Sequence, residues 1–208
     1  MQTLRLNIFW DYGIKDSTYT YPDRIINPLG HATDYEYDVG TGNVLSYTKN
    51  GIKTSYVYDT FGRVTKDIDP YDTTDFPTKS YTYNFDGIAP EIIKISQRTT
   101  SNNSIDNYFF YDGFANLVQL KSPADYGQQV VKNLFYDGLS RVSSEQNPYF
   151  DAFSTTLSNL SNQTNRTKYN YDSLGRVNSV INPDGTTKNT TFSKIEAFKY
   201  DNYTNMIW

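Results

Sequence analysis

The chain has no cysteine and only one histidine and two methionines among its 208 residues. Without cysteine, a disulfide framework, a thiolate metal site and a cysteine nucleophile are all excluded. The net charge is −4, and no basic stripe is present to neutralise phosphates, so we expect no nucleic-acid partner. No apolar run approaches the roughly 20 residues of a membrane helix. Met1 to Trp10 lacks the charged and apolar regions of a signal peptide, so we expect this segment not to encode export by the general secretory route.

Aromatic residues are what the chain has in excess, with 20 tyrosines and 12 phenylalanines. Asparagine, threonine and serine are abundant, whereas alanine and leucine are scarce, so strand formers dominate over helix formers. Disordered chains are poor in aromatic residues. The composition therefore predicts an ordered, all-β protein whose sheet has polar outer faces.

One short unit recurs along the chain. It consists of Tyr-Asp, any residue, an apolar or aromatic residue, a small residue, Arg or Asn, and an apolar residue. We predict repeat units near 35–51, 56–70, 81–95, 109–123, 134–148, 169–186 and 198–208. The copies begin at Tyr37-Asp38, Tyr58-Asp59, Tyr111-Asp112, Tyr136-Asp137, Tyr171-Asp172 and Tyr200-Asp201, with a worn copy at Tyr83-Asn84.

Each unit reads as one β-hairpin. Aromatic residues alternate before the Asp, as at Tyr56 and Tyr58, and residues i and i+2 of a strand share a face. The Asp ends the strand, and we expect its carboxylate to accept the N–H two residues on. A left-handed glycine then closes the turn. The motif glycines are Gly42, Gly62 and Gly175, whereas Ala115 and Ser140 at that place predict turns that are strained or of another type.

An arginine follows the Asp by four residues in three copies. We expect these arginines to pair across the turn with their own Asp, at under about 1 kcal/mol for a surface pair. We therefore interpret these arginines as structural residues of the turn and not as an anion-binding site. The pairs are Arg63 with Asp59, Arg141 with Asp137, and Arg176 with Asp172.

Neighbouring hairpins are expected to pair into one continuous sheet, because a lone hairpin is marginally stable in water. A proline often follows the return strand, as at Pro70 and Pro183, and ends the ladder since it has no N–H. The stretch 151–167 is rich in Ser, Asn and Thr, which predicts a surface loop.

The Tyr-Asp-x-x-Gly-Arg unit resembles the YD repeat of Rhs proteins, teneurins and insecticidal Tc toxin complexes. The order of units is similar to the Rhs segment of Tc-toxin B-type or SpvB-like proteins, from about Ile8 onward. Besides the repeats, three short segments carry this likeness: Asn27-Pro28-Leu29-Gly30-His31, Asn147-Pro148-Tyr149-Phe150 and Asn182-Pro183-Asp184-Gly185-Thr186.

The resemblance implies an extended, curved sheet of tandem antiparallel hairpins that forms part of a hollow Rhs-type β shell. It implies as partners the remainder of a larger Rhs-type protein, its enclosed C-terminal polypeptide and other toxin-complex subunits, and a secreted or cell-surface location. The Asp-, Pro- and Gly-rich motif that ends the family's shell, with its aspartyl self-cleavage site, is not found here. We therefore expect this chain to be a fragment of a longer protein.

Three constellations of residues have functional as well as structural interpretations. His31 is the only histidine and lies in a Pro-Leu-Gly-His turn without a nucleophile motif, so we interpret it as structural. The carboxylates of Asp67, Asp69, Asp72 and Asp75 lack the glycine and glutamate of a calcium loop, which favours a solvated loop. Rows of exposed tyrosines can stack on sugar rings, but packing between strands is the simpler interpretation.

Two functions remain as hypotheses. The first is a structural one, the wall of a toxin shell; the alternative is a surface module that binds carbohydrate or a partner protein. We predict no enzymatic activity, no cofactor and no metal site. The tyrosine rows distinguish the hypotheses, because replacing Tyr56 and Tyr58 with Ser abolishes binding in one case and folding in the other.

Overall fold

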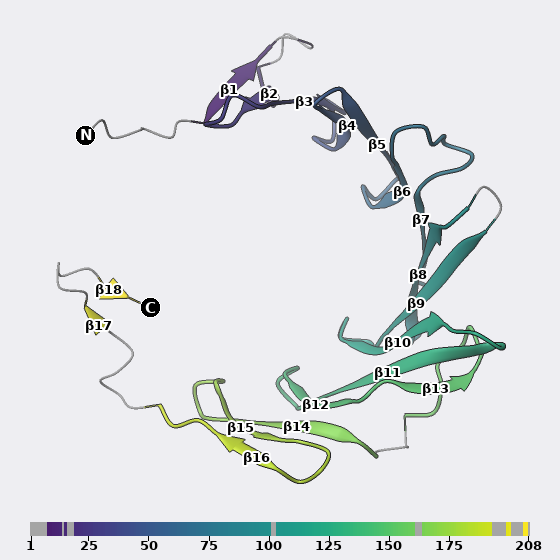
Figure 1. Ribbon diagram of the computed structural model, residues 1–208, viewed down its shortest axis with the longest axis vertical. Helices are drawn as coiled ribbons and strands as arrows, with labels where there is room; N and C mark the ends of the chain where they lie inside the picture. The colour runs from purple at the N-terminus through teal and green to yellow at the C-terminus, as the bar shows by residue number, and fades with distance from the viewer. Residues whose placement is uncertain are drawn as a thin grey trace. The chain divides into compact units, whose positions relative to one another are not determined.

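The computed structural model describes residues 8–13, 15, 19–100, 103–160 and 164–192, together with the backbone of 199–200 and 206–207. All regular structure in these residues is β-strand (Figure 1). Among them is no helix of the length and apolarity that crossing a membrane requires.

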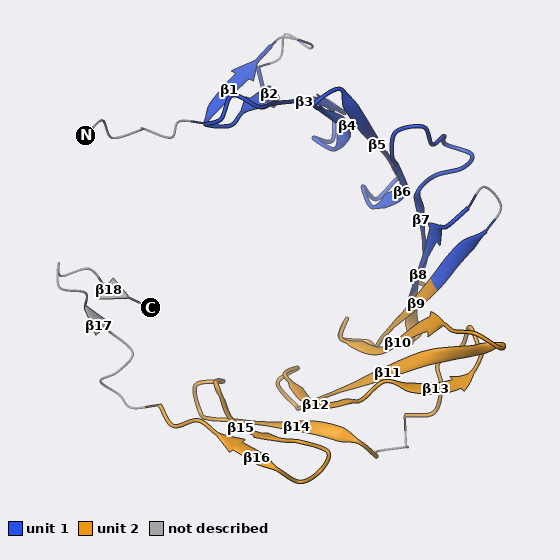
Figure 2. Ribbon diagram, viewed as in Figure 1, with its two compact units in different colours: residues 1–83, 93–106 blue, residues 84–92, 107–208 orange. Residues whose placement is uncertain are grey.

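Two compact units divide the chain (Figure 2). Unit 1 comprises residues 1–83 and 93–106, and unit 2 comprises 84–92 and 107–208. The boundary crosses three strands, β7 (Lys79–Asn84), β8 (Glu91–Arg98) and β9 (Ser104–Tyr111). Unit 1 also holds β1 (Phe9–Tyr12), β2 (Pro22–Ile26), β3 (Ala32–Tyr37), β4 (Val44–Lys49), β5 (Ile52–Tyr58) and β6 (Val64–Ile68).

The remaining strands belong to unit 2. They are β10 (Leu117–Pro123), β11 (Gln128–Tyr136), β12 (Val142–Gln146), β13 (Tyr149–Ala152), β14 (Arg166–Tyr171), β15 (Val177–Ile181), β16 (Thr187–Asn189), β17 (Lys199–Tyr200) and β18 (Met206–Ile207).

Strands β1 to β16 form one sheet in which sequence neighbours pair with each other, except that β13 pairs with β11 and β12 pairs with β14. In the described residues, all strand pairs are antiparallel. Strands β17 and β18 pair as a separate two-stranded sheet. The predicted all-β fold of tandem antiparallel hairpins in one extended sheet is confirmed.

The predicted loop at 151–167 is wrong at both ends. Asp151 and Ala152 belong to β13, which pairs with β11 from Gln128 to Val131. Arg166 and Thr167 begin β14. Ser and Thr fit exposed strand positions as well as loops, so composition alone did not separate the two.

Polar side chains dominate the buried positions. Phe110 and Val131 are the fully buried apolar residues of the described chain, whereas ten polar or charged residues are buried. Five of these form what we call the buried polar cluster of unit 2: Gln119, Lys121, Gln129, Asn133 and Gln146.

The segment 153–160 explains why these buried residues are polar. This segment makes few of its own backbone hydrogen bonds, and buried N–H and C=O groups require partners. Gln119 Oε1 accepts the N–H of Ser158 at 2.9 Å, and Gln129 Oε1 accepts the N–H of Ser154 at 3.2 Å. Lys121 Nζ donates to the carbonyl of Thr156 at 2.5 Å. An apolar core would leave these backbone groups without partners.

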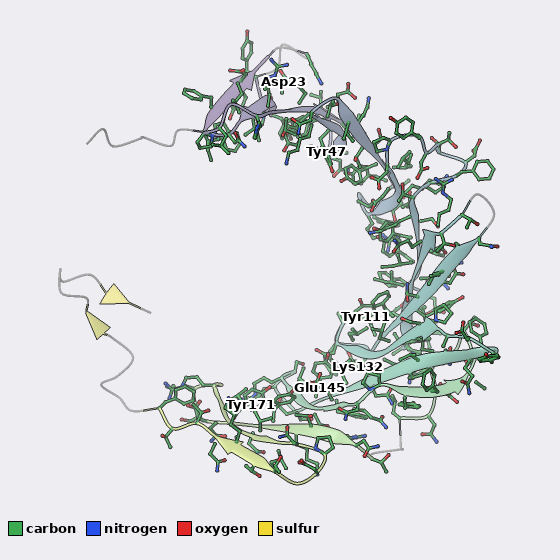
Figure 3. All side chains as sticks on the ribbon, viewed as in Figure 1. Asp23, Tyr47, Tyr111, Lys132, Glu145 and Tyr171 are labelled. Carbon is green, nitrogen blue, oxygen red and sulfur yellow. The ribbon has the colours of Figure 1, made fainter. Side chains whose placement is uncertain are left out.

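A hydrogen-bonded row runs across three strands beneath this segment. Gln119 Nε2 donates to Asn133 Oδ1 at 2.8 Å, and Asn133 Nδ2 donates to Gln146 Oε1 at 2.8 Å. Gln119 and Asn133 lie opposite each other in the ladder of β10 and β11, and Gln146 is the last residue of β12, the next strand of the sheet. On the other face, Glu145 pairs with Lys132 at 2.9 Å and accepts the hydroxyl of Tyr169 (Figure 3). This bond from Tyr169 to Glu145 raises the pKa of the tyrosine to about 12.

Candidate functional site: the repeated hairpin turn

The motif tyrosine is the last residue of its strand in five copies. The turn begins at the following Asp, and both the N–H and the C=O of this residue form hydrogen bonds within the turn. In the turn of Asp59, the Asp N–H donates to the carbonyl of Arg63 at 2.9 Å, and Gly62 N–H donates to the Asp carbonyl at 3.0 Å. The same two bonds recur, with donor–acceptor distances of 2.9 to 3.1 Å, at Asp112, Asp137 and Asp172.

The Asp carboxylate stabilises each turn by accepting hydrogen bonds from backbone N–H groups of the same turn. Oδ1 of Asp59 accepts the N–H of Phe61 and the N–H of Arg63, both at 2.9 Å. The equivalent pairs of bonds form at Asp112, Asp137 and Asp172. The hydrogen bond expected two residues after the Asp is therefore present. At Asp38, in the turn with one extra residue, Oδ1 accepts the N–H groups of Gly40 and Thr41 instead.

The same turn also occurs without tyrosine. Asn27 N–H donates to the carbonyl of His31, and its Oδ1 accepts the N–H groups of Leu29 and His31. Nδ1 of His31 lies 3.3 Å from Nδ2 of Asn27. The only histidine thus takes the place that arginine has in the repeats. Sequence reasoning placed His31 in a turn but did not recognise it as the turn of the repeats, although Asn27-Pro28-Leu29-Gly30 has an Asx residue three before a glycine.

The small residue of the motif has a left-handed backbone. Gly42, Gly62 and Gly175 have φ of 78°, 77° and 80°, and Ala115 and Ser140 have φ of 62° and 56°. The turns with Ala and Ser are therefore of the same type as the glycine turns. The expected strain remains, since a side chain in this region costs roughly 1 kcal/mol.

Replacing Ser140 with glycine should stabilise the protein. We expect Ser140→Gly to raise the free energy of unfolding by up to about 1 kcal/mol, because the left-handed position no longer carries a Cβ. Gly175→Ser, the reverse change in the equivalent turn, should lower it by a similar amount. The nearest atom to a Cβ at Gly175 is 3.8 Å away, so a clash does not complicate the comparison. Urea denaturation measures both; equal shifts of one sign for the two variants would contradict the assignment.

The motif arginine contacts two successive repeats. Arg63 Nε donates to Asp59 Oδ2 at 2.6 Å, and its guanidinium carbon lies 4.4 Å from the ring centre of Tyr83 in the following repeat. Arg141 bonds Asp137 and lies 4.3 Å from the ring centre of Tyr171. We call this arrangement the Asp–Arg–Tyr contact. Sequence reasoning found the ion pair but missed the contact with the next repeat, because nothing in a single unit shows which side chains face each other across the sheet.

The hydroxyl of the motif tyrosine donates a hydrogen bond to the preceding repeat. In each case it donates to the carbonyl of the residue that opens the preceding return strand, at 2.7 to 2.9 Å. The four pairs are Tyr58 to Val44, Tyr83 to Val64, Tyr136 to Leu117 and Tyr171 to Val142. Tyr83 and Tyr171 are thus fixed by both ring and hydroxyl, and the hydroxyl bonds of all four tyrosines join neighbouring hairpins.

Three copies lack the arginine and have Asn43, Asn116 or Asn205 at its place. Asn116 Nδ2 donates to Asp112 Oδ2 at 3.0 Å. In the worn copy, the carboxylate of Glu91 accepts the N–H groups of Asp86 and Gly87 and so takes over the role of the missing Asp. For the copy at Tyr200-Asp201, the backbone of Tyr200 lies in β17, and Asp201 lies outside the described residues.

The apolar residue of the motif lies at the tip of the turn and faces solvent. It is 73–85% exposed in four copies, at Phe61, Phe114, Leu139 and Leu174. Apolar side chains exposed singly are ordinary on protein surfaces, so these residues do not by themselves mark a binding surface.

We predict that the protein loses stability in acid, because the carboxylates of the turn aspartates become protonated. The side-chain hydrogen bond from Arg141 lowers the pKa of Asp137, and the backbone N–H of Arg176 lowers that of Asp172. Because these pKa values are lower in the folded than in the unfolded state, the stabilisation is present above about pH 4 and is lost as the pH falls through the folded values.

Thermal unfolding between pH 7 and pH 2.5 tests this. We expect Asp137→Asn to have a lower Tm than the unchanged protein at pH 7 and to lose less of its Tm on acidification. Parallel acid profiles for the two proteins would show that this carboxylate does not contribute.

A row of tyrosine rings runs along one face of unit 1. Neighbouring ring centres are 5.0 to 6.5 Å apart, and Tyr47 lies within the row (Figure 3). Burial raises the pKa of Tyr56, which indicates that these rings are partly shielded from water. Packing between strands, the simpler of the two interpretations, accounts for these contacts. The row consists of Tyr21, Tyr37, Tyr35, Tyr47, Tyr56 and Tyr58.

The four aspartates considered for calcium do not converge. Asp67 lies in β6 and accepts the hydroxyl of Tyr81 at 2.8 Å, so it is not part of a solvated loop as predicted. Asp69 accepts the hydroxyl of Thr54, and Asp72 accepts from Thr78 and Arg98. Asp75 lines a surface cavity. In the described part of the chain, no group of three or more His, Asp or Glu side chains is arranged to hold a metal.

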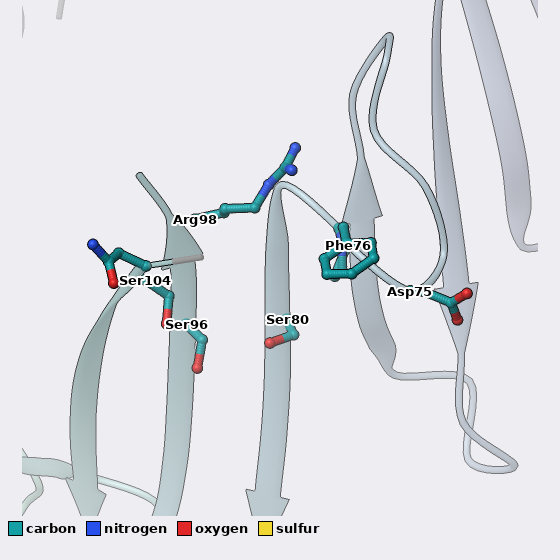
Figure 4. A pocket seen from close by; sticks show the side chains of 8 residues that line it. Asp75, Phe76, Ser80, Ser96, Arg98 and Ser104 are labelled. Carbon is teal, nitrogen blue, oxygen red and sulfur yellow. The ribbon is translucent and has the colours of Figure 1, made fainter. Parts of the chain in front are cut away.

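That cavity, of about 450 Å³, lies in unit 1 (Figure 4). Ser80 and Ser96 come from the neighbouring strands β7 and β8, with Phe76 and Arg98 beside them. Arg98 is already paired with Asp72. The chain's only histidine is held in the β2–β3 turn, so it is not available to these serines as a base.

The fold and the repeated turn together define a class, an all-β array of tandem hairpins joined by side chains of successive turns. No model of a known protein family matches the chain, and no curated protein matches it. Thirty-two chains of solved structures are similar. One, the crystal structure of TcdB2-TccC3-TEV, has a TM-score of 0.66 and 14% identity over 92% of this chain. This chain spans 14% of that chain's length. At this identity the likeness shows the fold alone.

Proposed function

We propose that this chain is a structural segment of an Rhs/Tc-type toxin shell, which encloses a C-terminal polypeptide of the same larger protein. The observation that carries the proposal is the Asp–Arg–Tyr contact. At the turns of Asp59 and Asp137 it joins one hairpin to the next, so these repeated residues serve the continuity of a wall. The motif resemblance and the fold of the TcdB2-TccC3-TEV structure support it.

A wall segment also needs surfaces that meet other parts of the same shell or further toxin-complex subunits. The remainder of the shell, the enclosed polypeptide and a secreted or cell-surface location all belong to this proposal.

Glycan binding stays a prediction. Four of the motif tyrosines donate their hydroxyls to carbonyls of their own sheet, and hydroxyls so engaged are not available to a sugar. We therefore favour the structural function.

The test uses the gene product as its source cells make it. We expect a protein much longer than 208 residues that appears hollow by electron microscopy. Its C-terminal polypeptide should resist trypsin until the particle is opened by denaturant. A gene product that ends with this chain, or one whose C-terminal part is digested at once, would contradict the shell proposal.

A further inference from the structure

The repeats allow one turn to be compared with another. In the turns of Asp59 and Asp137, a guanidinium lies between its own carboxylate and the tyrosine ring of the next repeat. In the turn of Asp112, between β9 and β10, the arginine is replaced by Asn116. The Asn116 amide reaches Asp112 Oδ2 at 3.0 Å, but the tyrosine of the next repeat has no arginine from this turn.

A cavity of about 460 Å³ lies at this place in unit 2. Its volume falls within the range of roughly 300–1,000 Å³ that is usual for ligand pockets. The acidic and aromatic groups of two successive turns line it, and apolar side chains complete the wall. The residues that matter here are Asp112, Asn116, Tyr136 and Asp137, with Phe114 and Leu134 beside them.

The charge of this cavity is not compensated. Asp112 accepts the N–H groups of Phe114 and Asn116 and the amide of Asn116, all of them neutral donors. Among the described residues, no lysine or arginine lies within ion-pair distance of Asp112. Asp137 keeps its own Arg141 at 2.7 Å. Asp112 therefore lacks the cation that Asp59, Asp137 and Asp172 have.

The aromatic side of the site is held in place. The hydroxyl of Tyr136 donates to the carbonyl of Leu117 at 2.9 Å, as the other motif tyrosines do in their repeats. The ring therefore keeps the anchoring that the equivalent rings have beneath an arginine. A planar guanidinium matches such a site better than an ammonium, because it stacks on a ring and donates in a fork to a carboxylate at the same time.

We propose that this cavity binds the guanidinium of an arginine side chain from a partner polypeptide. Asp112 accepts its N–H groups, and the Tyr136 ring lies against its face. The incoming arginine completes in trans the Asp–Arg–Tyr contact that other repeats make with their own arginine. The site does not depend on the chain being part of a shell.

The test titrates N-acetyl-arginine amide into the 208-residue chain and follows the amide signals of the Asp112 and Asp137 turns by NMR. N-acetyl-lysine amide is the matched ligand. Asn116→Arg supplies the guanidinium from the chain itself and should fill the site. Gln128→Arg adds the same charge at an exposed position of β11 and is the matched control.

We expect the arginine amide to bind at least five times more tightly than the lysine amide, with shifts confined to these two turns. Asn116→Arg should weaken binding at least tenfold and raise the Tm, whereas Gln128→Arg should bind within twofold of the unchanged chain. No saturable shift, equal binding of the two amides, or undiminished binding by a folded Asn116→Arg would each overturn the proposal.

Discussion

Asn133→Ala should lower the free energy of unfolding by about 2–4 kcal/mol. Asn133 is fully buried, accepts from Gln119 and donates to Gln146 and to the hydroxyl of Tyr149. Alanine removes these bonds, so Gln146 Oε1 loses the donor Asn133 and Gln119 Nε2 keeps only its longer bond of 3.4 Å to the carbonyl of Ser158. A buried polar group left unpaired costs about 1–3 kcal/mol. The loss is expected to exceed that of an ordinary hydrogen bond because the partners remain buried.

Urea denaturation at pH 7 measures this loss. Gln128→Ala is the matched control, since Gln128 lies on the same strand but is exposed, and its replacement should cost under about 0.5 kcal/mol. A loss of similar size for both variants would show that the buried polar cluster does not stabilise unit 2.

Phe110→Ala should have a still larger effect, about 3–5 kcal/mol. Phe110 is one of the two fully buried apolar side chains of the described chain, and its removal leaves a cavity that neighbouring strands fill only in part. The ring also lies 5.4 Å from Nζ of Lys121, a buried ammonium whose pKa is lowered by desolvation. Removal of the ring therefore also removes a cation–π contact of the Lys121 ammonium.

Phe114→Ala provides the control for that change. Phe114 is 85% exposed at a turn tip four residues further on, so the same substitution should cost under about 0.5 kcal/mol. A thermal or urea melt that gave equal losses for the two variants would contradict the assignment of Phe110 to the core.

Much of the fold could be predicted from the sequence, because the residues of each repeat determine the local structure of that repeat. The Asp carboxylate and the left-handed residue after it specify a turn within five residues, and the alternation of aromatic residues specifies the strand before it. The hairpins and their order along the sheet follow from that. The turns with Ala115 and Ser140 show the limit of the argument, since the carboxylate keeps the same turn even without glycine.

Contacts between distant residues were not accessible in the same way. The arginine was interpreted within its own turn, whereas its second partner, the next tyrosine, lies 20 residues away for Arg63 and 30 for Arg141. The buried polar cluster was missed because Gln119 and Lys121 have the composition of an exposed strand face. Polar residues are favoured on that face because the backbone of 153–160 lies across it and forms hydrogen bonds with them.

A double-mutant cycle on Arg141 and Tyr171 is the most direct test of the account, because it measures whether one hairpin stabilises the next through this pair. The free energies of unfolding of Arg141→Ala, Tyr171→Leu and the double variant should show a coupling of about 0.5–1 kcal/mol. The same cycle on Asn116 and Tyr136, where no arginine is present, should show none beyond about 0.3 kcal/mol. Additive losses at Arg141 and Tyr171 would contradict the claim that the motif joins successive hairpins.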